Sequence, residues 1–375
     1  MFLPLFPIYV SSFGISITDL GLVVASFAIA TVIFQVPFGA VSDHLGRKPM
    51  IVIALLGYAV TSFLYALSTN TIEFVTFRFL QGTASAAMWS PAEALILDSS
   101  DPKQRGLGMG FYQTSFNAGL IAGPIIGGLI ATLQGVRMPF YFAAALALVA
   151  AALALVLLKE PPRTVKGEKS HIFNPLKGLI EMPVEIRSAI LILALANLFE
   201  IIGYGIFEPI FPLYASKEFG ASPTLIGLVF SVGSIGLVIG PSPMGRLGDK
   251  YGQKPLIVGG LVVISLFVAA YAWVFDVVSL VILMIPVSLG TSAFLTALPT
   301  LVGNLAPVEK RALVLGAVNT AGNLGLVIGP IIAGFAWDMF GSRIPFYIDS
   351  LSVALGAVLV YLKVTGRRTI REEKT

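Results

Sequence analysis

The stretch GAVSDHLGRKP at residues 39–49 places an aspartate, two glycines and an Arg-Lys-Pro run between two long apolar segments. A closely similar stretch, GRLGDKYGQKP, returns at residues 245–255 and is again followed by an apolar segment. A polar corner of this kind that occurs twice indicates that the chain is built from two related halves.

The 375-residue chain is too apolar for a soluble domain, because its mean hydropathy is +0.90 and only 12% of its residues are charged. Apolar runs such as 50–67, 138–158 and 256–274 have the length that a helix needs to cross a bilayer, about 17 to 25 residues. The alternating pattern of an outer-membrane barrel does not occur, so helices are the spanning structure that remains. We therefore predict an all-α polytopic membrane protein.

Short polar corners separate twelve apolar runs, of which the first is too short to span a bilayer. The expected spans are residues 1–11, 19–41, 50–68, 72–97, 107–133, 138–158, 188–214, 223–246, 256–275, 278–303, 312–336 and 345–363. The polar stretch 159–187 divides them into an amino-terminal half, 1–158, and a carboxy-terminal half, 188–363, which a tail follows at 364–375.

Lysines and arginines are distributed unevenly between the two ends of the expected bundle. Placing the even-numbered span ends on one side collects all of them there except Arg78, Arg137, Lys217 and Arg343. Positive residues gather on the cytoplasmic side of membrane proteins. We therefore expect a multi-pass protein of the cytoplasmic membrane, with both polar corners, the central loop and the tail facing the cytoplasm.

A shift of 206 residues superimposes the two halves at many positions. Among the matched pairs are Gly39 with Gly245, Asp43 with Asp249, Lys48 with Lys254, Asn117 with Asn323, and Gly123-Pro124 with Gly329-Pro330. One offset accounts for all of them, so the halves are repeats in the same orientation. Two parallel six-helix repeats are the architecture of a rocking secondary transporter, whose binding site lies between the halves near the midplane.

The repeat also predicts a longer first span than the one present. Pro4 matches Pro209 at a shift of 205, yet about twenty apolar residues precede Pro209 and only three residues precede Pro4. A helix of about eleven residues does not reach across about 30 Å of hydrocarbon. We therefore expect that this sequence lacks roughly the first half of span 1.

With these corners, the sequence resembles the major facilitator superfamily over essentially its whole length. The family's signature between spans 2 and 3, roughly G-x-x-x-D-x-x-G-R-K, is matched by Gly39, Asp43, Gly46, Arg47 and Lys48. The second copy has Gln253 in place of the arginine and keeps Gly245, Asp249, Gly252 and Lys254. The resemblance implies that these corners hold the inner ends of the two halves together and act as a gate. A well-formed positive turn is the simpler interpretation.

Span 5 carries a second family motif. The pattern G-x8-G-x3-G-P-x2-G-G is matched by Gly110, Gly119, Gly123, Pro124, Gly127 and Gly128. It resembles the antiporter motif of the drug:proton exchanger branch. Ordinary close packing of small residues is the alternative, because span 11 carries a near copy.

The string FRFLQG at 77–82 resembles the family's motif around a membrane arginine, here Arg78, which the family links to proton coupling. A charge in the bilayer is costly unless it faces a cavity or an acid. Glu200, near the expected midplane of span 7, is the preferred proton-coupling acid, with Glu208 and Asp349 as further candidates. For each acid the alternative is a packing hydrogen bond or a charge at the rim.

Several polar side chains within the spans are candidates for lining a substrate cavity. They are Gln113, Asn117, Asn197, Tyr204, Asn319 and Asn323. The 206 shift pairs Gln113 with Asn319 and Asn117 with Asn323, which places matching amides on corresponding faces of spans 5 and 11. Hydrogen bonding between helices is the alternative role for them.

Other chemistries find little support in the sequence. Cysteine is absent, and His44 and His171 are the only histidines, so we expect no metal site. No G-x-x-x-x-G-K-[ST] string occurs, so we expect neither nucleotide-driven pumping nor a cofactor. A cluster of catalytic polar residues is also absent, so the chain is not expected to be an enzyme or to bind nucleic acid.

The function predicted from the sequence is a proton-coupled antiporter that exports small amphipathic compounds or drugs by alternating access. Its expected partners are a small-molecule substrate, protons and the lipid bilayer, and a monomer is expected. Three alternatives remain open, namely a proton-coupled symporter, a metabolite or sugar exporter of the same superfamily, and a membrane sensor that transports nothing.

Overall fold

The computed structural model describes residues 1–99, 104–160, 182–307 and 310–364. Throughout these residues the regular structure is helical, without a strand. Nine of the described helices are long and apolar enough to cross a membrane, and a bent pair of shorter ones makes a tenth. The prediction of an all-α polytopic membrane protein is confirmed. Most of the expected central loop and the carboxy-terminal tail lie outside the described residues.

The helices fall into two bundles that follow each other along the chain. The amino-terminal bundle contains η1 (Leu3–Leu5), α1 (Phe6–Ser11), α2 (Ile17–Leu45), α3 (Arg47–Leu67), α4 (Thr71–Ala86), α5 (Trp89–Ser99), α6 (Arg105–Gln134) and α7 (Met138–Leu157). The carboxy-terminal bundle contains α9 (Val184–Phe219), α10 (Pro223–Ile239), α11 (Pro241–Tyr251), α12 (Gln253–Tyr271), α13 (Val277–Leu305), α14 (Arg311–Phe340) and α15 (Ile344–Lys363).

Two of the expected spans, 72–97 and 223–246, are each broken into two helices. One break lies between α4 and α5, and the other between α10 and α11, which meet at an angle of 46°. Pro91 and Pro241 stand in the first turn of the second helix in each case. A proline there lacks the N–H for the helix ladder, and its ring collides with the carbonyl four residues earlier, so the preceding helix cannot continue unbent.

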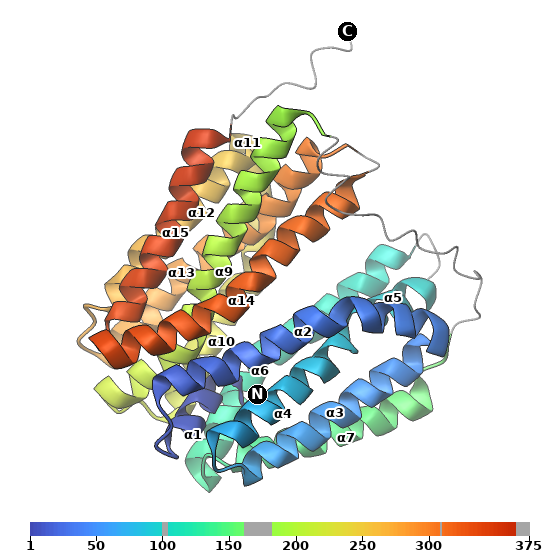
Figure 1. Cartoon of the computed structure of the whole chain (residues 1–375), viewed down its shortest axis with the longest axis vertical. Helices are drawn as coiled ribbons and strands as arrows, with labels where there is room; N and C mark the ends of the chain where they lie inside the picture. Colours follow the sequence, from blue (N-terminus) through green and yellow to red (C-terminus); the bar gives the residue numbers. More distant parts are fainter. Residues whose placement is uncertain (100–103, 161–181, 308–309, 365–375) are drawn as a thin grey trace.

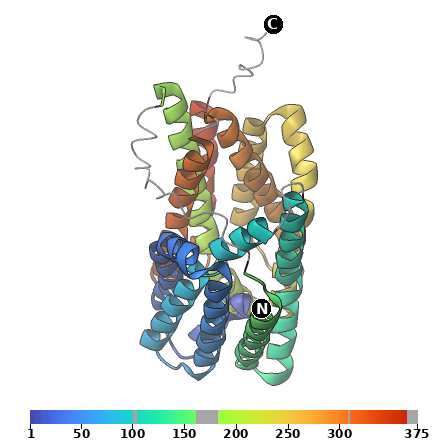
Figure 2. The ribbon, with the colours of Figure 1, turned by 90° about the vertical axis from the view of Figure 1, so that its right-hand side faces the viewer.

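The two bundles meet along two helix pairs and diverge at one end. Helix α2 packs against α14, and α6 packs against α10. The bundles lie together where α2 begins and α14 ends, and they separate toward the end of α2 and the start of α14 (Figure 1). We call this open side the basic end, because it carries the corners at Gly46 and Gly252, and the closed side the opposite end. Figure 2 shows the blue amino-terminal helices below the red and orange carboxy-terminal ones.

Glycines allow the bundles to touch backbone to backbone at the opposite end. A Cβ on Gly21 of α2 would collide with the carbonyl oxygen of Pro330 in α14. The 206 shift relates this contact to a second one, because a Cβ on Gly227 of α10 would collide with the carbonyl oxygen of Pro124 in α6. Both joints between the halves therefore depend on the absence of a side chain.

Polar contacts reinforce the same two joints. The carboxylate of Asp338, near the end of α14, accepts hydrogen bonds from the backbone N–H of Thr18 at 2.7 Å and from the Thr18 hydroxyl at 2.7 Å. At the related joint, the Oγ1 atoms of Thr224 and Thr132 lie 2.9 Å apart in a hydrogen bond. One joint is therefore closed by a carboxylate on a helix amino terminus, which is a favourable site for negative charge, and the other by two hydroxyls.

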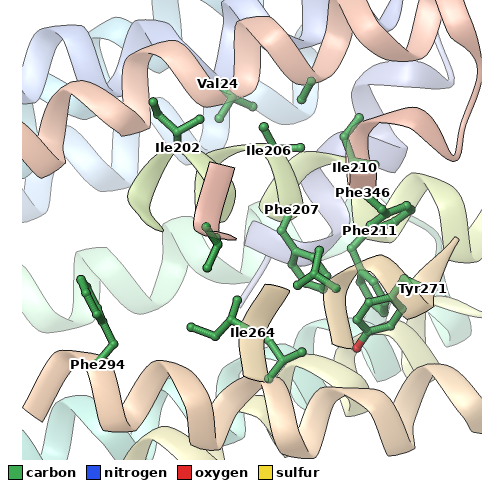
Figure 3. Close-up of a cluster of buried hydrophobic side chains, with 14 of the residues drawn as sticks. Val24, Ile202, Ile206, Phe207, Ile210, Phe211, Ile264, Tyr271, Phe294 and Phe346 are labelled. Carbon is green, nitrogen blue, oxygen red and sulfur yellow. The ribbon is translucent and has the colours of Figure 1, made fainter. Parts of the chain in front are cut away.

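An aromatic cluster forms the core of the carboxy-terminal bundle at the opposite end (Figure 3). The ring of Phe346 is fully buried and lies 4.9 Å from that of Tyr214 and 5.8 Å from that of Tyr271, measured between centroids. Edge-to-face and offset stacked pairs of this kind add to the free energy of burial.

Truncation of this cluster tests its contribution to stability. We expect Phe346→Ala to lower the free energy of unfolding by about 3 to 5 kcal/mol, because it removes buried contacts and leaves a cavity. Titration of the purified protein with a denaturing detergent measures the change. Phe275→Ala is the matched control, since the side chain of Phe275 is 81% exposed. Equal effects of the two substitutions would contradict the prediction.

Candidate functional site

Two adjoining cavities lie inside the structure, and the same two side chains of α9 border both. The first, about 470 Å³, is lined by α2, α3, α4 and α7 and by Met1, Phe2 and Leu3 of one half, and by α9 and α14 of the other. We call it the arginine cavity, because Arg78 lines it. The second, about 230 Å³, lies mainly within the carboxy-terminal bundle and is called the carboxyl cavity. Tyr204 and Glu208 border both cavities.

Arg78 is held in the amino-terminal bundle by one hydrogen bond and two aromatic rings. It is only 4% exposed, and its Nη1 donates to Gln81 Oε1 at 2.8 Å. Tyr65 donates to the same amide oxygen at 3.1 Å. The guanidinium lies 4.8 Å from the ring centroid of Phe6 and 4.7 Å from that of Phe27, so cation–π attraction replaces part of its lost hydration.

The Arg78 guanidinium has a free hydrogen-bond donor with which it could bind a negatively charged group. Its Nε is buried without a hydrogen-bond partner, and the described residues place no carboxylate oxygen within ion-pair distance of it. Glu208 lines the same cavity from the other half and interacts electrostatically with Arg78. The attraction between the two charges therefore acts across the cavity, and its strength depends on how the halves are placed.

All three proton-coupling candidates line the carboxyl cavity, and of the three only Glu208 also borders the arginine cavity. Glu208 faces Arg78, whereas Glu200, which the sequence favoured, lines only the carboxyl cavity together with Asp349. Position along span 7 could not reveal this, because Glu200 and Glu208 are eight residues apart and project from the same side of one helix.

The predicted cavity amides occupy different environments. Asn197 is buried and donates from Nδ2 to the carbonyl of Val318 at 2.9 Å, so it joins α9 to α14. The other four amides line neither cavity, and among them Gln113 and Asn319 are exposed while Asn117 and Asn323 are half-buried. Tyr204 alone of the six borders the described cavities. A role of the amides in substrate binding stays a prediction.

Acidic side chains that the sequence analysis did not single out hold the first corner together. Glu160, just after α7, accepts from the backbone N–H of Arg47 at 2.7 Å and of Lys48 at 2.8 Å. The Arg47 side chain lies 3.3 Å from a carboxylate oxygen of Asp98 at the end of α5. Both acids lie close to span ends that the sequence places on the same side of the membrane as the corner. Their position in the sequence could therefore have identified them as partners of the corner.

The described contacts of both corners stay within one half. Glycines with positive φ, Gly46 and Gly252, make the two turns. In the second corner Lys254 donates from Nζ to the carbonyl of Tyr361 at 2.8 Å, and Asp249 is exposed. Asp43 lies in the last turn of α2, and its side chain is outside the described part. The gating role of the corners, including Gly39 and Gly245, stays a prediction.

The span 5 motif faces two different neighbours. Pro124 and Gly128 lie against α10 of the other half, at Gly227 and at Pro223. On the neighbouring face of α6, Gly123 and Gly127 lie against Met1, while Gly110 and Gly119 have open space beside them. Part of the motif therefore packs the halves together, as the alternative interpretation expects. Its meaning for antiport stays a prediction.

The comparisons with known proteins agree with this arrangement. The family model described as Major Facilitator Superfamily matches residues 1–192 and again residues 193–375. This chain belongs to the Major Facilitator Superfamily. Each half of the major facilitator protein therefore carries its own match.

Two relatives whose names state a function match this major facilitator chain over nearly its full length. Quinolone resistance protein NorA of Staphylococcus aureus strain MRSA252 is 29% identical over 99% of this chain and 94% of its own length. Multidrug resistance protein 1 of Bacillus subtilis strain 168 is 30% identical over 95% of this chain and 90% of its own. A bacterial homologue of the human lysosomal transporter Spinster, solved in an inward-facing and occupied conformation, has a TM-score of 0.75 at 17% identity, covering 97% and 92% of the two chains.

Proposed function

We propose that this major facilitator protein exports small amphipathic compounds in exchange for protons, by alternating access in the cytoplasmic membrane. The observation that carries the proposal is the arginine cavity, which places Arg78 of one half opposite Glu208 of the other. The names of the two relatives, quinolone resistance protein and multidrug resistance protein, support drugs as the class of cargo. Efflux also agrees with the motif of span 5.

The orientation follows from the distribution of basic residues. With the basic end toward the cytoplasm, the bundles are closed on the outside and separate on the inside, so the structure corresponds to an inward-facing state. The central loop and the tail then lie in the cytoplasm. The solved structure described as inward-facing shares the overall fold of this chain.

Coupling is proposed to arise from the charge on Glu208. When Glu208 is ionised, its attraction to Arg78 favours the arrangement of the halves that brings the two groups closest. A proton on Glu208 removes that attraction, so proton binding and rocking become linked equilibria. Arg78 and Glu208 belong to different halves, so their attraction across the cavity is sufficient to couple proton binding to the rocking of the halves.

A transport measurement tests the proposal. The full chain is reconstituted in vesicles with an acidic lumen, and a quinolone or ethidium is added outside. We expect wild type to accumulate the compound while the lumen becomes less acidic, and Arg78→Ala to do neither. Arg78→Lys, which keeps the charge, serves as a second variant if Arg78→Ala does not fold.

The same assay separates the alternatives. A symporter moves compound and proton in the same direction, so it does not concentrate the compound in acidic vesicles. Folded wild-type protein that leaves both the gradient and the compound unchanged would contradict proton-coupled export of these compounds and would favour another cargo or a sensor.

A further inference from the structure

The two corners at the basic end are related by the repeat but differ in their charged partners. In the first corner, Arg47 pairs with Asp98, and the carboxylate of Glu160 accepts from the backbone at the start of α3. The 206 shift puts Asn304 in the place of Asp98. It puts Gly366 in the place of Glu160. The second half therefore lacks the two acids that balance the first corner.

Three lysines gather where the second corner meets the end of α15. Lys250 stands where the first half has His44, and Lys363 stands where it has an apolar residue. Lys254 matches a lysine of the first corner and donates from Nζ to the carbonyl of Tyr361, so it lies at the carboxy-terminal end of α15. Lys363 follows Tyr361 by two residues. We call Lys250, Lys254 and Lys363 the lysine cluster.

The charge of the lysine cluster is not balanced within the described part of the chain. No described acid lies within ion-pair distance of Lys250, Lys254 or Lys363. Asp249 is the only acid in residues 245–255, and its side chain is exposed. The cluster therefore carries a net positive charge at the end of the bundle that meets one leaflet of the membrane.

Exposed aromatic and apolar side chains lie beside the lysine cluster. Lys250 Nζ lies 4.9 Å from the ring centroid of Tyr251. Lys254 Nζ lies 5.6 Å from that of Tyr361. The two tyrosines are 62% and 66% exposed, and Leu362 is 65% exposed. Helix α15 runs along the side of its bundle that faces away from the amino-terminal bundle (Figure 1). Tyrosines at the ends of membrane helices lie at the level of the lipid headgroups.

These surroundings indicate which anion fits the cluster. Lysine ammonium groups attract a phosphate group as point charges. A soluble phosphate meets only these charges, whereas a phospholipid also covers the exposed tyrosines and Leu362 with its chains. A zwitterionic lipid carries a cation beside its phosphate, and the unbalanced lysines repel that cation. Basic sites at the ends of membrane helices bind the headgroups of anionic lipids.

We propose that the lysine cluster binds the phosphate headgroup of an anionic phospholipid in the leaflet at the basic end, with its acyl chains along α15. The related corners then have different partners, which are acids of the same chain for the first and a lipid for the second. The inference does not depend on the proposed export function, because none of the three lysines borders either cavity.

Lipid binding to the purified full chain in a neutral detergent tests the site. Native mass spectrometry compares phosphatidylglycerol with phosphatidylcholine of the same acyl chains. We expect wild type to bind the first phosphatidylglycerol at least about tenfold more tightly than phosphatidylcholine. Lys250→Gln and Lys363→Gln should each weaken phosphatidylglycerol about fivefold, the contribution of one lysine beside an anionic headgroup. Lys217→Gln makes the same change at the exposed opposite end of α9 and should bind like wild type.

A substitution that keeps every lysine tests the charge separately. Asn304→Asp, near the end of α13, gives the second half the acid that the first corner has at Asp98. We expect it to weaken phosphatidylglycerol several-fold and to leave phosphatidylcholine unchanged, whereas Asn304→Gln should change neither. Added salt should act in the same selective way, because it screens exposed charges. A purely structural defect would lower the binding of both lipids alike, so the ratio of the two affinities reports the site.

The outcomes separate the occupants and the functions. Displacement of phosphatidylglycerol by inorganic phosphate at millimolar concentration would overturn the lipid as the occupant. Equal affinity of wild type for the two lipids, or an unchanged preference in a folded variant with all three lysines replaced by glutamine, would overturn the site. A preference that depends on the cluster supports the site even in a protein without gradient-driven transport, a result that contradicts only the proposed export.

Discussion

Glu208→Gln is expected to abolish proton-driven export, reducing accumulation in acidic vesicles to the level of protein-free vesicles. Glutamine keeps the size and hydrogen-bonding ability of the side chain but cannot exchange a proton, so the gradient no longer biases the rocking of the halves. Arg78 then faces a neutral group in every state. Uptake of a labelled compound into vesicles with and without a pH gradient measures the loss.

Exchange of the compound itself should survive in the same variant. With compound on both sides and no gradient, Glu208→Gln is expected to exchange labelled for unlabelled compound, because rocking with bound cargo needs no proton. Glu185→Gln is the matched control on α9 and should keep gradient-driven uptake. If Glu208→Gln still concentrated the compound at the expense of the gradient, another group would have to carry the proton.

A leucine at Gly21 or Gly227 is expected to stop transport completely by preventing closure of the opposite end. Each glycine lies against a carbonyl oxygen of the other half, so even a Cβ requires the backbones to move apart. The variants should remain in states that are open at that end. Gly259→Leu is the control, because a Cβ at Gly259 of α12 meets nothing within 4 Å.

Spin labels can report the state directly, since the chain has no native cysteine. Cysteines at Thr69 and Phe275 lie near the opposite end on the two halves, and cysteines at Leu45 and Tyr251 lie near the basic end. We expect Gly21→Leu to lengthen the first distance and shorten the second relative to wild type. Unchanged distances in a variant that still transports would contradict a closure role for the glycine.

The fold was largely predictable because its main determinants are local or repeated. Long apolar runs identify spans, and the 206-residue shift relates the halves without any structural knowledge. The breaks before Pro91 and Pro241 were missed, although both prolines are visible in the sequence. A bend changes neither the hydropathy nor the length of a span, so run counting does not detect it.

The site was predictable in its residue types but not in its grouping. Arg78, Glu200, Glu208 and Asp349 were identified as unusual charges in apolar runs, yet which cavity each of them borders depends on helix rotation and packing. Gly203 illustrates the difficulty, because only the packed structure reveals that it makes room for Asp349. Asn197 hydrogen-bonds α9 to α14, which is the alternative role that the sequence analysis gave for the amides, and its polarity alone does not decide between the two roles.

The unequal joints at the opposite end suggest how such a transporter responds to its surroundings. Asp338 holds one joint through charge on a helix terminus, whereas Thr132 holds the related joint through a neutral hydroxyl. Dissolved salt weakens the first kind of contact and leaves the second nearly unchanged. In the proposed orientation both joints meet the external medium. High external salt would therefore weaken the joint at Asp338 and leave the joint at Thr132 nearly unchanged.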